Sequence, residues 1–231
     1  MSKIAVILSG SGYLDGSEIR EAVGVLWALS RAGAEAECFA PDIVQRDVVD
    51  HLTGEPVAER REVLVESARI ARGSVSPLAE LRSSEFDALI MPGGFGAAKN
   101  HSSFAHEGSS GNVLPELGYI LHQFHEEGKP IGAICIAPAV LALAFPGLPL
   151  ELTVGAIGDA SMEIEKLGHT HIATQAHEIH VDREHRIVTT PAYMYDDAQL
   201  ADVFEGIKSL VDEVILMTSN RSEYKKSLAG A

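Results

Sequence analysis

Short apolar runs alternate with amphipathic stretches along most of this chain. Ile4 to Leu8 is apolar and ends in a glycine-rich loop, and Ala34 to Ala40 is a second such run. Between them, from Ile19, apolar residues recur at steps of three and four, and this spacing predicts a helix. A strand, a helix and a strand in that order predict a parallel pair with a right-handed crossover.

The alternation continues to residue 218. Further strands are expected at 86–91, 131–135, 150–154, 172–173 and 187–190, the last two around a polar hairpin at 182–185. Further helices are expected at 42–51, 62–71, 113–127, 138–145, 158–167 and 196–218. The serine-rich segment 100–112 is expected to be an exposed loop, long enough for a lid. Together these elements predict an α/β fold, a doubly wound, mostly parallel sheet with helices on both faces.

Composition narrows the class of protein. With 231 residues and 46% hydrophobic content, the chain is expected to form one domain over 1–218, followed by a frayed tail at 219–231. A net charge of -15 argues against nucleic acid or an anionic membrane as a partner. The sequence has no apolar run of membrane-spanning length, and Met1 is followed almost directly by a strand. We therefore expect a cytoplasmic protein.

Cys135 lies where a predicted strand turns into a helix that has Pro138 in its first turn. Such a corner pushes a side chain out beside unpaired helix N–H groups, which favour negative charge. The sequence therefore predicts a reactive thiol, its pKa lowered from about 8.5 toward roughly 3.5–7.5. The alternative is a buried cysteine that acts as a small apolar residue.

Two other loops follow strands at the same predicted edge of the sheet, where ligands bind in such folds. Gly93-Gly94 allows close backbone approach, so the N–H groups of Gly94 and Ile136 are candidates for an oxyanion hole; the alternative is a plain turn. Glu18, in the first turn of its helix, is the candidate acid/base, and Glu21 is the competing choice. An acidic residue at that position is also ordinary helix-dipole complementation.

Two further patterns argue against cofactors. Gly10-Ser11-Gly12 follows a strand, but Asp15 stands where a dinucleotide-binding fingerprint needs its third glycine. Several histidines cluster after residue 168, but His177 and His180 lack the spacing of a helical zinc motif. We expect neither a nucleotide cofactor nor a metal.

Longer motifs resemble one family. They are Ile-Leu-Ser-Gly-Ser-Gly at 7–12, Asp-Gly-Ser-Glu-Ile at 15–19, His-Leu-Thr-Gly-Glu at 51–55, Pro-Gly-Gly-Phe-Gly-Ala-Ala-Lys-Asn at 92–100, Cys-Ile-Ala-Pro-Ala at 135–139 and Thr-Thr-Pro-Ala-Tyr-Met at 189–194. In this order, over residues 3–217, they resemble the ElbB proteins, in the PfpI-like branch of the class I glutamine amidotransferase-like superfamily.

The resemblance implies a flavodoxin-like sheet, a nucleophile elbow at Cys135 with Glu18 as its partnering carboxylate, and a homodimer. It also implies a glutathione-independent glyoxalase that converts glyoxal, a small dicarbonyl, to glycolate without a cofactor. Protein deglycation and a link to isoprenoid production are further implied. This chain departs from many superfamily members in having Ile136, not histidine, after the nucleophile.

Two rival functions remain open on the sequence. One is a non-enzymatic regulatory module that uses Cys135 as a redox sensor. The other is a cysteine amidohydrolase, which needs a histidine to relay the proton to the leaving amine.

Overall fold

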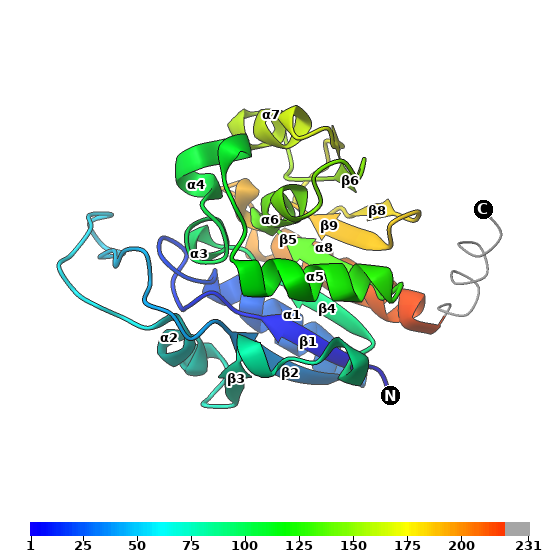
Figure 1. The fold of residues 1–231 in the computed structure, drawn as a ribbon, viewed down its shortest axis with the longest axis horizontal. Helices are drawn as coiled ribbons and strands as arrows, with labels where there is room; N and C mark the ends of the chain where they lie inside the picture. Colours follow the sequence, from blue (N-terminus) through cyan, green and yellow to red (C-terminus); the bar gives the residue numbers. More distant parts are fainter. Residues whose placement is uncertain (220–231) are drawn as a thin grey trace.

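The computed structural model describes residues 1–219, so the predicted tail beyond Ser219 lies outside the described residues. A seven-stranded sheet runs in the order β3-β2-β1-β4-β5-β9-β8 (Figure 1). Its strands are β1 (Lys3–Ile7), β2 (Glu35–Ala40), β3 (Val75–Pro77), β4 (Ala88–Met91), β5 (Ile131–Ile134), β8 (His180–Asp182) and β9 (Ile187–Thr190). Only β8 is antiparallel to its neighbour. The predicted fold class is confirmed.

Helices cover both faces of the sheet. One face carries α1 (Ile19–Arg31), α2 (Val63–Ile70) and α8 (Leu200–Ser219). The other carries α3 (Phe95–Lys99), α4 (Phe104–Glu107), α5 (Pro115–Glu126), α6 (Ala137–Ala144) and α7 (Asp159–Lys166). The 3-10 turns are η1 (Leu78–Glu80), η2 (Ser83–Glu85), η3 (Gly108–Ser110) and η4 (Ala192–Met194).

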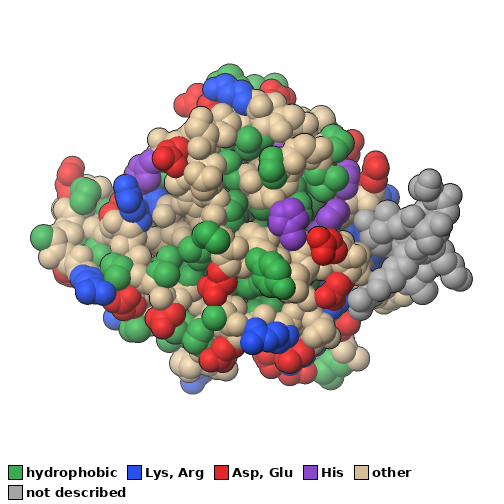
Figure 2. Space-filling model, in the orientation of Figure 1, with side chains coloured by type: hydrophobic (Ala, Val, Ile, Leu, Met, Phe, Trp, Pro, Cys, Tyr) green, Lys and Arg blue, Asp and Glu red, His purple; other side chains and the backbone are tan. Residues whose placement is uncertain are grey.

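Strand β1 shows why the sequence favours this arrangement. Its side chains point to alternate faces, so Ile4 and Val6 pack against α1 and α8, while Ala5 and Ile7 pack with the α5 and α6 side. All four are fully buried, and this accounts for the continuous apolar run. Figure 2 shows acidic, basic and apolar side chains interspersed over the face that carries α5.

The predicted helix at 42–51 is wrong. Segment 41–62 is an irregular loop with isolated bridges between Val44 and Glu62 and between Val49 and Pro56, and it projects from one end of the sheet (Figure 1). Side chains from elsewhere in the chain hold its backbone in place of helical hydrogen bonds. For example, the Val49 N–H donates to the Asp15 carboxylate. The adjacent prediction of a helix at 62–71 is confirmed by α2.

Three smaller expectations also need correction. The strand predicted at 172–173 lies at Thr170–His171 (β7) and pairs with β6 (Glu151–Leu152) in a separate two-stranded sheet, while β8 forms the hairpin with β9. Strand β3 was missed because it has three residues. Segment 100–112 is not a wholly exposed lid: it contains α4, and His101 is fully buried with its Nε2 3.1 Å from the Leu8 carbonyl.

Candidate active site

Cys135 lies between the end of β5 and the start of α6, with a positive φ of 61°. A non-glycine residue in this region is strained, and such strain is typical of a nucleophile on a strand-to-helix turn. The Cys135 N–H donates to the Thr190 carbonyl at 2.9 Å, which ties the corner to β9. The predicted strand-to-helix elbow at Cys135 is confirmed as a backbone geometry.

The Gly93-Gly94 turn packs against this corner so closely that neither position has room for a side chain. A Cβ on Gly93 would lie 2.4 Å from the Cys135 Cβ, and one on Gly94 would lie 2.3 Å from the Glu18 nitrogen. Gly94 also has a φ of 91°. The turn is therefore a close approach between β4, α1 and the thiol, which a plain turn does not require.

Glu21 is the carboxyl that contacts the thiol. It is fully buried and shares a hydrogen bond with Cys135. Its Oε2 accepts from the Gly93 N–H at 2.9 Å, and its Oε1 accepts from the Tyr193 N–H at 3.3 Å. Backbone from two loops thus fixes the carboxyl beside the sulfur.

Glu18, the residue that the sequence favoured, lies one helical turn before Glu21 and caps the helix. It is the N-cap of α1, and its Oε2 accepts from the Glu21 N–H at 2.6 Å. Its own N–H donates to the Gly93 carbonyl at 3.0 Å. Half-buried, it lines the cavity beside Cys135. The structure therefore brings both carboxyls to the site but places Glu21, the competing choice, on the thiol.

The two N–H groups predicted to form an oxyanion hole both face the nucleophile. Those of Gly94 and Ile136 donate hydrogen bonds to the Cys135 sulfur. An oxygen on a carbon bound to that sulfur would lie two bonds from the sulfur, so the same two N–H groups are candidates to donate to it.

The expectation of a lowered thiol pKa is wrong for this resting geometry. Burial raises the pKa of Cys135 well above its ordinary value, and the nearby Glu21 carboxyl raises it further. The N–H groups of Gly94 and Ile136 act in the opposite direction but are outweighed. Only 7% of Cys135 is exposed, so the helix terminus acts on a desolvated group.

The carboxyl partner is shifted in the same direction. Burial, and then the charge of Glu18, raise the pKa of Glu21 to about 8, although three hydrogen bonds oppose the shift. Burial also raises the pKa of Glu18. At pH 7 Glu21 is therefore mostly protonated, and the Cys135–Glu21 pair is mostly neutral.

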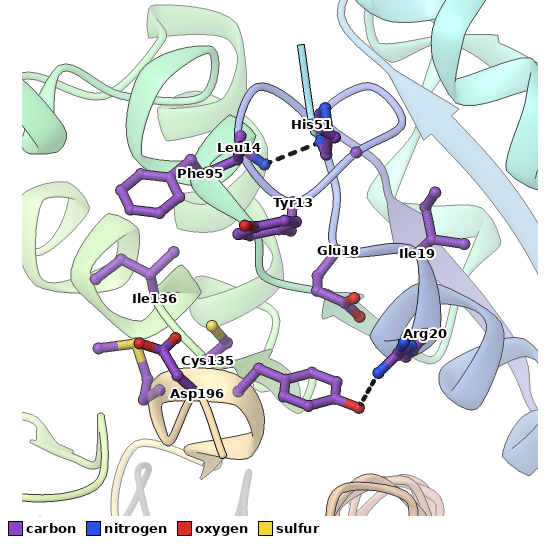
Figure 3. Close-up of a pocket in the computed structure, with 14 residues that line it drawn as sticks. Tyr13, Leu14, Glu18, Ile19, Arg20, His51, Phe95, Cys135, Ile136 and Asp196 are labelled. Carbon is purple, nitrogen blue, oxygen red and sulfur yellow. Dashed lines mark hydrogen bonds between the residues drawn. The ribbon is translucent and has the colours of Figure 1, made fainter. Parts of the chain in front are cut away.

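A cavity of about 920 Å³ opens onto Cys135 and Glu18. It is lined by Gly12, Tyr13, Leu14, Glu18, Ile19, Arg20, His51, Gly94, Phe95, Cys135, Ile136, Tyr193, Met194 and Asp196. Figure 3 shows Cys135 and Arg20 on opposite sides of the cavity, with Glu18 between them in this view. The loop after β1, the turn after β4, the elbow and η4 all contribute to its wall.

Tyr193 is the residue of this site that sequence reasoning missed. Its backbone holds Glu21, and its phenol oxygen accepts from Arg20 Nη1 at 2.9 Å. The preceding Ala192 has a φ of 43°, a strained conformation that turns η4 toward the site. The available signal was the motif at 189–194, which contains Tyr193 but does not indicate its role.

Histidines are set apart from the thiol. The groups that hydrogen-bond to the Cys135 sulfur within residues 1–219 come from Glu21, Gly94 and Ile136. His51 lines the cavity, but its Nε2 accepts from the Leu14 N–H at 3.3 Å. His185 pairs with Asp182 at 2.8 Å and His180 with Glu151 at 3.0 Å, while His169 Nε2 lies 2.9 Å from the Ala142 carbonyl. These three histidines therefore have partners other than the thiol.

Within residues 1–219 no group of three histidine, cysteine or acidic side chains is arranged to hold a metal ion. Among the same residues, no helix has both the length and the apolar character needed to cross a bilayer.

The fold and the elbow define a class I glutamine amidotransferase-like α/β protein with a cysteine at the nucleophile position. Residues 3–147 match the DJ-1/PfpI family. This chain belongs to the DJ-1/PfpI family.

The relatives share most of the chain. It is 44% identical over 227 residues to the human "Glutamine amidotransferase-like class 1 domain-containing protein 3, mitochondrial", covering 94% of this chain and 84% of that protein. It is 33% identical over 236 residues to "ES1 protein, mitochondrial" of Danio rerio, covering 94% and 87%. An Ehrlichia chaffeensis crystal structure of an "isoprenoid biosynthesis protein with amidotransferase-like domain" superposes with a TM-score of 0.88 at 41% identity, covering 94% and 99%.

Proposed function

We propose that the protein is a glutathione-independent glyoxalase of the ElbB type, which converts glyoxal to glycolate on Cys135. One observation carries the proposal: the thiol, at a strained elbow, has both a carboxyl and two N–H donors within hydrogen-bond contact. This set supplies a nucleophile, a proton acceptor and an oxyanion site without a cofactor.

In the first step the Cys135 sulfur adds to one aldehyde carbon. The thiol proton passes to the Glu21 carboxylate, the C=O π bond breaks, and the new oxyanion accepts from the Gly94 and Ile136 N–H groups. Glu21 then returns the proton to that oxygen. The product is a neutral thiohemiacetal. We assign this proton transfer to Glu21 because its carboxyl is hydrogen-bonded to the thiol.

In the second step a proton moves between the two substrate carbons. Glu18 lines the cavity, so it is the carboxyl that reaches a carbon bound to sulfur. It removes the C–H proton, which gives an enediolate, and returns a proton to the neighbouring carbon, while the hydroxyl proton of the first carbon passes to the oxygen of the second. The first carbon is oxidised to a thioester and the second is reduced to an alcohol, so no external oxidant is needed. Water then cleaves the C–S bond, and the thiol leaves with its proton.

The two rival functions gain less support from the geometry. A peroxide sensor needs an exposed thiolate, whereas Cys135 is buried and its pKa is raised. An amidohydrolase needs an imidazole on the thiol, and the groups that hydrogen-bond to the Cys135 sulfur within the described residues are a carboxyl and two backbone amides.

The proposal is tested with purified protein and glyoxal, by following glycolate with NMR. The wild type should form glycolate, and Cys135→Ser should not. Cys38→Ser is the matched control, because Cys38 is the other cysteine and lies on β2 away from the cavity. Glutamine with an ammonia readout tests the amidohydrolase alternative. Glycolate formation by Cys135→Ser at the wild-type rate would exclude a covalent role for this thiol.

Partners and compartment stay predictions. A homodimer is expected from the resemblance, and light scattering of the purified chain tests it. A cytoplasmic location is expected from the sequence, while two relatives carry "mitochondrial" in their names. Localising a tagged full-length chain decides between the two compartments.

A further inference from the structure

The cavity is far larger than the proposed small substrate. Glyoxal has four non-hydrogen atoms, so at about 30 Å³ each, the share of one water molecule in the liquid, it fills roughly 120 Å³. The cavity measures about 920 Å³, within the range of about 300–1,000 Å³ typical of sites for much larger ligands. Glyoxal alone would leave most of the wall in contact with water.

The wall next to the elbow is apolar and aromatic. Tyr13, Phe95, Ile136 and Met194 all line the cavity. Phe95 is 47% exposed and Tyr13 is 48% exposed, so both rings present apolar surface to whatever enters. Figure 3 shows Phe95 and Ile136 on the same side of the cavity as Cys135. An apolar body attached to the reacting carbonyl would bury these side chains.

The far side of the cavity offers hydrogen-bond donors. Arg20 Nη1 donates to the Tyr193 phenol oxygen at 2.9 Å, so this oxygen already acts as an acceptor. The phenol proton is then left to donate to another group, and Tyr193 lines the cavity. Arg20 also lines it and carries further N–H donors. Tyr193 and Arg20 can therefore both donate hydrogen bonds to an oxygen acceptor on a ligand.

Charge argues that this acceptor is neutral. Glu18 and Asp196 line the same cavity, and Arg20 already interacts electrostatically with Glu18. The chain as a whole carries a net charge of -15. A carboxylate or phosphate would meet two acidic side chains with a single arginine to offset them, whereas an amide or ketone oxygen avoids that repulsion.

We infer that the substrate is an uncharged 2-oxoaldehyde with a bulky apolar body and a carbonyl or amide oxygen at its far end, which Tyr193 and Arg20 bind. This inference rests on the proposed function for its reacting group. Its reaction balances as before, with R–CO–CHO and water giving R–CHOH–COOH on Cys135. Tyr193 is then a specificity-determining residue through its side chain, while its backbone N–H holds Glu21.

The test compares four 2-oxoaldehydes by initial rates taken before the dicarbonyl modifies arginines. They are glyoxal, phenylglyoxal, 4-isopropylphenylglyoxal and 4-carbamoylphenylglyoxal; the last two have similar shapes, and only the carbamoyl compound has an acceptor. We expect kcat/KM for phenylglyoxal to exceed that for glyoxal by at least about tenfold. The carbamoyl compound should exceed the isopropyl compound by about 3- to 10-fold.

Tyr193→Phe should remove the preference for carbamoyl over isopropyl, because it keeps the ring and the backbone N–H and loses only the phenol. Tyr119→Phe is the matched control: Tyr119 is exposed on α5, on the opposite face of the sheet from α1, and should keep the wild-type ratio. An unchanged ratio in Tyr193→Phe, or glyoxal as the best substrate, would overturn the inference while the proposed function stands.

Binding separates this inference from the chemistry. Calorimetry on Cys135→Ser measures the binding affinity of four unreactive 2-hydroxy amides that correspond to the four aldehydes. They are glycolamide, mandelamide, 4-isopropylmandelamide and 4-carbamoylmandelamide. Tightest binding of the carbamoyl form would support the assignment of the pocket. If the wild type at the same time turned over none of the aldehydes, the proposed glyoxalase function would be overturned while the pocket assignment stood. Equal binding of all four would overturn the pocket assignment.

Discussion

The carboxyl of Glu21 and the thiol of Cys135 share a hydrogen bond in a buried position, although 113 residues lie between them along the chain. Two backbone N–H groups fix the carboxyl, and two others face the sulfur. The pair therefore behaves as one acid/base unit, and its proton governs when the thiol can react.

Replacing each carboxyl should separate the two proton-transfer steps. Glu21→Gln should slow both glyoxal turnover and Cys135 alkylation by iodoacetamide, since it removes the group that accepts the thiol proton. Glu18→Gln should slow turnover by about 10²–10⁴-fold, a typical loss for a general acid/base, and leave alkylation within a few-fold of wild type. Equal effects of the two variants on alkylation would contradict the assignment of Glu21 to the thiol.

Activity should depend on pH through the same carboxyl. Because the pKa of Glu21 is raised to about 8, its basic form is scarce at pH 6 and grows as pH rises through 8. We expect kcat/KM for glyoxal to increase about tenfold per pH unit below 8 and to level off above it. A flat profile between pH 6 and 8 would show that Glu21 is already ionised.

Stability should change with pH in the opposite direction. The ordinary pKa of Glu21 is 4.5 and its folded value is about 8, so between these values the folded state holds more protons than the unfolded state. The stability that Glu21 contributes is present below pH 4.5 and is lost as pH rises to about 8, by a few kcal/mol. In denaturant titrations, the unfolding free energies of wild type and Glu21→Gln should be similar at low pH and should diverge as pH rises, because only the wild type loses this stability. The surface variant Glu80→Gln should follow the wild type. Parallel curves for wild type and Glu21→Gln would refute the shift.

A side chain at position 94 would be unfavourable for two reasons, a steric clash and a positive φ, and a comparison with Gly73 separates them. Gly94 has a φ of 91° and Gly73 a φ of 84°, but a Cβ on Gly73 meets nothing within 4 Å. Gly73→Ala should cost about 1 kcal/mol of unfolding free energy, from strain alone. Gly94→Ala should cost at least about 3 kcal/mol and abolish turnover, because its Cβ would collide with the Glu18 nitrogen. Similar losses in the two variants would mean that the turn can relax.

Apolar runs and glycine positions were enough to predict the parallel strands β1, β2, β4, β5 and β9, the corner at Cys135 and the three loops at the sheet edge. The helix expected at 42–51 failed because that segment is stabilised by distant side chains such as Asp15, which no local pattern reveals. Which of Glu18 and Glu21 contacts the thiol could not be predicted for a related reason: both lie near the start of α1, and only tertiary packing decides which carboxyl faces the sulfur. The thiol pKa depended on burial, which the helix-terminus argument omitted.

The most direct test is glyoxal conversion in deuterium oxide, with the glycolate carbons read by NMR. Proton transfer through a carboxyl that exchanges with solvent predicts a deuteron on the glycolate CH₂ carbon in the wild type, and no glycolate from Cys135→Ser. Glycolate without deuterium would indicate a direct hydride shift, and glycolate formed by Cys135→Ser at the wild-type rate would contradict catalysis by this thiol.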